Sequence, residues 1–92
     1  MYNRFAAARR RYLRTHRDGI YTGILLTGTL ERHLAEIGES AQAMFDRLVE
    51  QLKKAEGVTE QLKAADQMEW VGRMNSVRQR AEEIVLHDLI YN

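Results

Sequence analysis

The chain lacks cysteine and proline altogether. Without cysteine it has no disulfide framework and no thiolate metal site, which is typical of proteins of a reducing compartment. Without proline, nothing in the sequence forces a helix to kink or to stop. The 92 residues, of which 45% are hydrophobic, suffice for one small domain, residues 1–92, with a modest core.

Long apolar runs are missing too. No stretch approaches the roughly 20 apolar residues that span a bilayer. The charged start is not followed by the apolar segment of a secretory signal. β-branched residues never alternate with polar ones over the length of a strand. We therefore expect an all-α, cytoplasmic protein that does not bind membranes.

Helical periodicity predicts four helices, over residues 2–16 (within a basic segment, 1–17), 20–27, 29–55 and 59–91. Asp18-Gly19 and Gly28 are expected to end the first two. The last two should form a long antiparallel hairpin, with the basic helix and the short second helix packed on it. At its joint, Gly57 suits a left-handed C′ position, Val58 the apolar contact after it, and Thr59 an N-cap.

Both hairpin helices carry an apolar seam with spacings of three and four residues. The seam of the third helix is Leu30, Leu34, Ile37, Ala41, Met44, Leu48 and Leu52. That of the fourth helix is Trp70, Met74, Val77, Ala81, Ile84 and Tyr91. We expect Trp70 to anchor the core. From Ile84 to Tyr91 the helix is apolar nearly all round, so either the first two helices or a second copy must cover it; we favour a homodimer.

Acidic residues are missing from the first seventeen positions, which hold six arginines and a charge of +6. The remaining residues hold eight Lys/Arg and thirteen Asp/Glu, a charge of −5. Five arginines fall within about 140° of a helical wheel, opposite the apolar residues. These are Arg4, Arg10, Arg11, Arg14 and Arg17. Arg9 lies among the apolar residues, where its stem could run along the surface.

Such charge asymmetry indicates a polyanionic partner, and guanidinium groups suit phosphate because their planar fork donates two hydrogen bonds at once. We therefore interpret the five arginines as a DNA-binding face. An acidic protein surface is the alternative, including the acidic third helix of a second copy. Simple solvation of the face is a further alternative. Membrane binding is disfavoured because the apolar face has few large residues.

Other candidate sites are weak. A helix-turn-helix over residues 20–37 would present Glu31, Glu36 and Glu39 to the phosphates, which would repel them. The three histidines are too scattered for a local metal-ligand pair. The glycines at 19, 23 and 28 do not match a phosphate-binding loop. We expect no enzymatic activity, no catalytic residue, no cofactor and no metal site.

Several stretches resemble the transposon-encoded TnpV family. They include Arg10-Arg11-Tyr12-Leu13, Tyr21-Thr22, His33-Leu34-Ala35-Glu36-Ile37, the joint at residues 55–60, Lys63 to Val71, and Arg80 to Leu86. The similarity extends over nearly the whole chain from Arg10 onward. It implies a small accessory protein of mobile genetic elements. It implies no particular activity and no catalytic or binding residue.

The sequence also departs from that family. Family members carry an N-terminal extension before the basic helix, which this sequence lacks, and with it a second contact surface could be absent. They often have proline where this chain has Asp18 and Glu50. Without the second proline, we expect a straighter third helix. Two functions remain open: a DNA-binding accessory of transposition, or an interaction module that dimerises and docks on a recombinase or another acidic partner.

Overall fold

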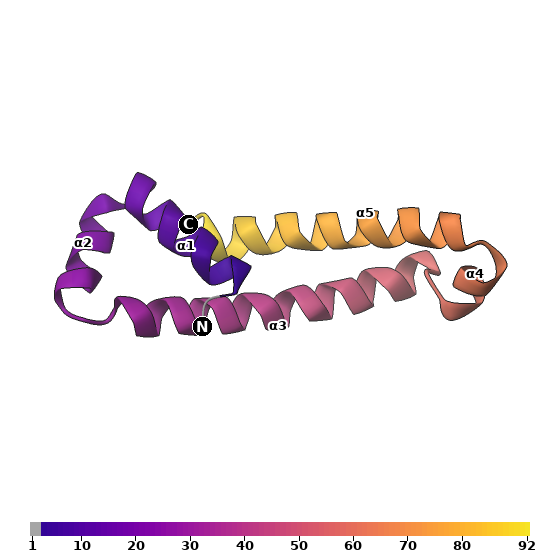
Figure 1. Ribbon diagram of the computed structural model, residues 1–92, viewed down its shortest axis with the longest axis horizontal. Helices are drawn as coiled ribbons and strands as arrows, with labels where there is room; N and C mark the ends of the chain where they lie inside the picture. Colours follow the sequence, from indigo (N-terminus) through magenta and orange to yellow (C-terminus); the bar gives the residue numbers. More distant parts are fainter. Residues whose placement is uncertain (1–2) are drawn as a thin grey trace.

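The computed structural model describes residues 3–92, and all its regular structure there is helical. The elements are α1 (Arg4–His16), α2 (Asp18–Leu26), α3 (Leu30–Glu56), α4 (Glu60–Ala65), α5 (Gln67–Val85) and a π-helical turn, η1 (Leu86–Ile90). This confirms the all-α prediction. In Figure 1, α3 and α5 lie side by side and run in opposite directions, with α4 between them at one end. Helices α1 and α2 lie at the other end of a molecule 55 Å long and about 20 Å wide.

The start of α1 is fixed to the middle of α3. The Asn3 side chain accepts a hydrogen bond from the Ala6 amide (2.9 Å), which caps the helix, and donates one to the Gly38 carbonyl (2.9 Å). A Cβ at Gly38 would lie 2.9 Å from Asn3 Oδ1 and 3.0 Å from the Ala6 methyl. Only glycine therefore lets α1 approach α3 this closely. The predicted start at Tyr2 lies outside the described residues.

The first helix ends at His16, as predicted, but the second begins at Asp18 and not at Ile20. The break falls at Arg17, whose backbone (φ −134°, ψ 53°) is not helical, and α2 begins at Asp18 itself. Asp18 lies in the first turn of α2 instead of after α1. A carboxylate there is favourable because the helix N-terminus carries partial positive charge. Asp18 does mark a boundary between two helices, as predicted, but it begins α2.

The other two predicted boundaries hold. Gly28 has φ +74° and ends α2, and Gly57 has φ +67° after the last turn of α3. Both are left-handed conformations that glycine adopts without steric cost. Val58 is buried, and the Thr59 side chain accepts a hydrogen bond from the Leu62 amide (3.2 Å). The joint at residues 57–59 is therefore built as its sequence indicates.

The single helix predicted over residues 59–91 is wrong. The chain breaks at Asp66 (φ −152°, ψ 88°), which separates α4 from α5. The Asp66 carboxylate accepts a hydrogen bond from the Glu69 amide (3.1 Å) and so caps α5. An acidic or hydroxyl residue followed three positions later by glutamate is the pattern of a capping box. The apolar spacing continues across Asp66, so a prediction based on periodicity alone missed this capping pattern.

The end of α5 differs from the predicted seam. Val85 is fully buried, whereas Ile84 is 38% exposed. The following π turn, closed by a 2.8 Å hydrogen bond from the Tyr91 amide to the Leu86 carbonyl, widens the helix and buries Ile90 completely. Tyr91, which was expected in the seam, is 51% exposed.

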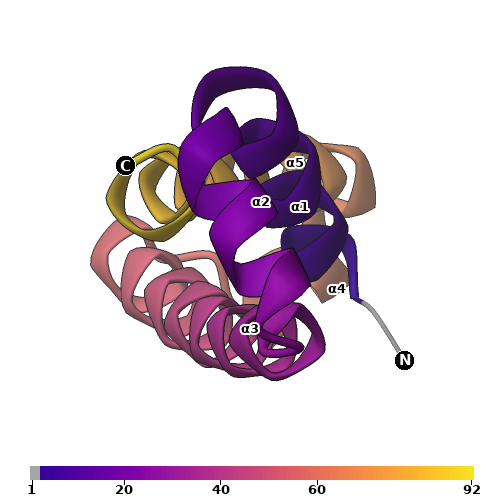
Figure 2. The same cartoon turned by 90° about the vertical axis from the view of Figure 1, so that its left-hand side faces the viewer.

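The buried side chains of residues 3–92 form three clusters, two at the α1 end and one at the α4 end. One of the two at the α1 end consists of Ala6, Leu30 and Leu34, with Tyr21 and Ile24 of α2 packed against it. In the other cluster at this end, Phe5, Ala8, Ala41, Val85 and Ile90 pack together. Viewed from that end, α1, α3 and the C-terminal turn surround a common centre (Figure 2). This core takes in Val85 and Ile90, with Leu86 and Leu89 packed against it, from the stretch that suggested a dimer, whereas Ile84 and Tyr91 stay exposed. Part of that stretch is therefore covered within one chain.

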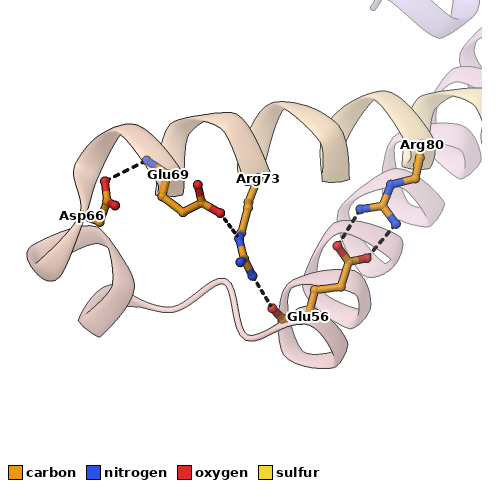
Figure 3. A network of polar contacts seen from close by, with 5 residues as sticks. All are labelled: Glu56, Asp66, Glu69, Arg73 and Arg80. Carbon is orange, nitrogen blue, oxygen red and sulfur yellow. Dashed lines mark hydrogen bonds and ion pairs between the residues drawn. The ribbon is translucent and has the colours of Figure 1, made fainter.

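The core at the α4 end consists of Val58, Met74 and Val77, with Trp70 packed against it. Trp70 is only partly buried, and the Lys63 ammonium lies 4.6 Å from its ring centroid. It is therefore not the main anchor that was expected. Polar contacts tie this end together (Figure 3): Arg80 pairs with the Glu56 carboxylate at 2.6 and 2.7 Å, and Arg73 with Glu69 at 2.7 Å.

Candidate nucleic-acid interface

Helix α1 separates an apolar face from a cationic one, as its sequence predicts. Phe5, Ala6, Ala8 and Leu13 are buried against the rest of the molecule. The five predicted DNA-binding arginines are all solvent-exposed, and four of them lie together in the C-terminal half of α1 and directly after it. They are Arg10, Arg11, Arg14 and Arg17. We call these four residues the arginine face.

Arg4 lies apart from the arginine face. Its Nε is 3.3 Å from Glu82 Oε1, and its guanidinium carbon lies 4.5 and 4.6 Å from the ring centroids of Phe5 and Phe45. An ion pair and two aromatic rings therefore hold this side chain toward α5. We expect its contribution to an anion-binding surface to be smaller than the helical wheel suggested, because its side chain is directed toward the carboxylate of Glu82.

Arg9 is the largest departure from the sequence-based expectation. Instead of running along the surface, it is only 9% exposed. Its Nη1 donates hydrogen bonds to the backbone oxygens of Ile90 (2.7 Å) and Asn92 (3.1 Å), and its Nε donates to His33 Nε2 (3.3 Å). Arg9 thus ties α1 to α3 and to the turn that follows α5. Burial lowers the pKa of Arg9, and the nearby Arg17 charge acts in the same direction.

Arg17 is also placed differently from the wheel, because it stands at the break after α1. Its guanidinium carbon is 5.9 Å from the Tyr12 ring centroid, so the side chain folds back toward α1. Close to this point, Tyr12 stacks on His16, with ring centroids 5.0 Å apart and planes at 12°. The four-residue spacing of Tyr12 and His16 could have indicated this pair, since such residues are neighbours on a helix.

The electrostatic setting of the arginine face favours anions. Helix α1 contains no acidic residue. The four arginines concentrate positive charge on one part of the surface, and such a concentration attracts anions. The acidic residues of the chain lie in the other helices or at their caps, and the first of them, Asp18, directly follows Arg17. The arrangement can therefore bind phosphate through several charge-assisted hydrogen bonds.

The described residues show few features of other functions. Within residues 3–92, no group of three or more His, Asp and Glu side chains could hold a metal ion. In the same part of the chain, no helix is both long enough and apolar enough to cross a membrane.

The fold and this surface define a class: a small all-α protein in which a helical scaffold holds one strongly cationic helix by its apolar face and by the buried Arg9. The chain belongs to the family described as transposon-encoded protein TnpV, whose family model matches residues 1–90. This confirms the resemblance seen in the sequence. No curated protein and no solved structure is significantly similar to the chain.

Proposed function

We propose that this transposon-encoded protein is an accessory factor that binds DNA through the arginine face of α1. The observation that carries the proposal is the contrast among the six arginines. Arg9 is buried and Arg4 is directed toward Glu82 on α5, whereas Arg10, Arg11, Arg14 and Arg17 gather at the other end of α1, where all four are solvent-exposed. A chain that needed only solubility would have little reason to gather four guanidinium groups with no acid among them.

The dimensions of the face suit a nucleic-acid backbone. Residues 10 to 17 span about 10 Å at 1.5 Å per helical residue. Over that length each strand of B-DNA presents about three phosphates, at roughly 3.4 Å per strand along the axis. Four arginines on a strip of this size can therefore neutralise several phosphates without any rearrangement of the backbone.

The scaffold presents the arginine face rigidly. Asn3, Phe5 and Arg9 each hold α1 to another element through a cap, core packing or buried hydrogen bonds. Binding therefore needs to order only the arginine side chains and not the helix itself. This lowers the entropic cost of association.

Substitution of three arginines tests the proposal. Arg10→Gln, Arg11→Gln and Arg14→Gln together should weaken binding to a short DNA duplex by an order of magnitude or more at low salt. A matched control replaces Arg32, Arg47 and Lys54, which are exposed along α3, with glutamine. Both variants carry the same net charge, so only the position of the lost charges differs. Equal weakening by the two would show that net charge, and not the arginine face, controls binding.

Exposed apolar residues favour a second candidate function, protein docking through α2. No residue of α2 is buried, and Ile20, Leu25 and Leu26 are 54%, 51% and 80% exposed. This surface could carry a homodimer, or a contact with a recombinase or another acidic protein that also engages the arginines. Light scattering of the parent and of Leu26→Asp tests the homodimer: a dimer that becomes a monomer supports it.

A further inference from the structure

A hollow lies beside the arginine face, and the proposed contacts between arginine and phosphate give it no role. It has a volume of about 420 Å³ and is lined by Ala8, Arg11, Tyr12, Thr15, His16 and Tyr91. The first five of these residues lie on one side of α1, and Tyr91 follows the π turn η1. Small-molecule sites typically have volumes of roughly 300–1,000 Å³, so the hollow is large enough for a ligand.

Three aromatic rings border the hollow. Tyr12 stacks on His16, and the Tyr91 ring lies against Tyr12 with centroids 5.4 Å apart and planes at 40°. His16 is exposed and Tyr91 is half-exposed, so these rings keep contact with solvent. Exposed aromatic rings next to cationic residues are the means by which proteins stack unpaired bases.

The charge of the residues that line the hollow favours a negatively charged ligand. Arg11 belongs both to the hollow and to the arginine face, and none of the six lining residues is acidic. A flat aromatic group could stack on the rings while a phosphate attached to it binds the Arg11 guanidinium. A nucleotide combines these two parts.

We propose that this hollow binds an unpaired base of a DNA strand whose phosphates contact the arginine face. The inference rests on the proposed DNA binding and deepens it. A base inside a duplex offers no free face to a protein ring, because its neighbours occupy both. Helix α1 would therefore prefer DNA in which a duplex meets unpaired bases, at a gap or an overhang, over a fully paired duplex.

Paired DNA probes test this preference. One probe is a blunt duplex, and the other is the same duplex with a short single-stranded overhang carrying the fluorescent base 2-aminopurine. The overhang should raise affinity about tenfold, the scale of one stacked base. The fluorescence of 2-aminopurine should fall on binding, because stacking quenches it.

Variants of Tyr91 test whether the hollow causes the gain in affinity and the quenching. Tyr91→Leu should abolish both the gain from the overhang and the quenching, while affinity for the blunt duplex stays unchanged. Tyr91→Phe keeps the ring and should behave as the parent. If circular dichroism shows that Tyr91→Leu loses helix, His16→Leu replaces it, because His16 is exposed on the same hollow.

The outcomes separate this inference from the proposed function. Equal affinity for blunt and overhang probes, without quenching, overturns the base-binding hollow and leaves DNA binding intact. Absence of binding to either probe overturns both. A free mononucleotide that binds as tightly as the overhang, or an RNA overhang that binds more tightly than the DNA one, overturns the assignment to a DNA strand.

Discussion

The two ends of the molecule are stabilised in different ways. At the α1 end, three segments distant in sequence enclose Phe5, Leu13, Leu34 and Ile90, each at most 1% exposed. At the α4 end, two helices share a small core, and ion pairs such as Glu56–Arg80 lie on the surface. Exposed ion pairs contribute little to stability, whereas fully buried apolar side chains contribute most of it.

The difference in packing between the two ends can be compared with the position of the arginine face. The arginine face lies on the well-packed end, where α1 is fixed by contacts with α3 and with the C-terminal turn. The α4 end, with fewer buried side chains, should open more readily under native conditions. The proposed binding surface is thus carried by the more stable half of the molecule.

The largest contrast between the ends should come from their aromatic residues. Phe5→Ala should reduce the free energy of unfolding by about 3–5 kcal/mol, because it empties a fully buried site. Trp70→Ala should cost only about 1–2 kcal/mol, because Trp70 is partly exposed at the smaller core. Denaturant melts of the two variants measure both values. An equal or larger loss for Trp70→Ala would show that the α4 end carries the main core.

The next largest effect should come from replacing two glycines with alanine, one substitution lowering the stability of the protein and the other raising it. Gly38→Ala should destabilise the protein by about 1–3 kcal/mol, because the new methyl group would meet Asn3 and Ala6. Gly72 lies within α5, and a Cβ there meets nothing within 4 Å. Gly72→Ala should therefore stabilise by about 0.5–1 kcal/mol through helix propensity alone. Thermal melts compare the two, and stabilisation by Gly38→Ala would mean that α1 does not approach α3 so closely.

A smaller effect should appear as a pH dependence at the α1 end. Burial lowers the pKa of His33, the Arg9 charge lowers it further, and Glu36 opposes them. Neutral His33 accepts the Arg9 hydrogen bond, so its contribution is complete above the usual pKa of about 6.5. Between this value and the lowered pKa of the folded state, the unfolded chain binds more protons than the folded one. The contribution of His33 to stability is therefore lost as the pH falls through this range.

His33→Gln should remove this dependence, since glutamine offers an acceptor that does not titrate in this range. The control is His87→Gln, because the His87 side chain is 88% exposed. Urea melts between pH 5 and 8 measure the slope of stability with pH for each variant. A slope that survives His33→Gln unchanged would assign the dependence to another group.

The smallest effect should come from the ion pair at the α4 end. Glu56→Gln should lower the melting temperature only slightly, because both side chains are partly exposed. The hydrogen bond from Arg80 lowers the pKa of Glu56 below its usual 4.5. The difference between variant and parent should therefore hold above pH 4.5 and vanish as the pH falls through the folded-state pKa. A difference that persists in acid would mean that the glutamine disturbs the joint sterically.

Local signals in the sequence predicted most of the secondary structure. Gly28, Gly57 and Thr59 act within one turn of their own position, so their roles can be read from neighbours alone. The capping pattern of Asp66 and Glu69 was equally local but was outweighed by the apolar seam that continued past it. The exposed positions of Arg11 and Arg14 followed from helical periodicity.

Long-range contacts could not be predicted in this way. Arg9 lies 81 residues from its acceptor Ile90, whose carbonyl stands at the end of a helix, where no donor of the same helix can reach it. Gly38 is required by the close approach of another helix, which no local pattern encodes. Tyr91 joins the hollow on α1 for the same reason. The DNA-binding role of the arginines was a prediction from charge alone and stays one.

The salt dependence of DNA binding tests the central proposal most directly. If each residue of the arginine face neutralises one phosphate, log affinity should fall against log salt concentration with a slope of about −3.6. In the variant with Arg10, Arg11 and Arg14 replaced by glutamine, the slope should shrink to about −0.9 at unchanged helical content. An unchanged slope in the folded variant would contradict the proposal and place the DNA contact elsewhere on the protein.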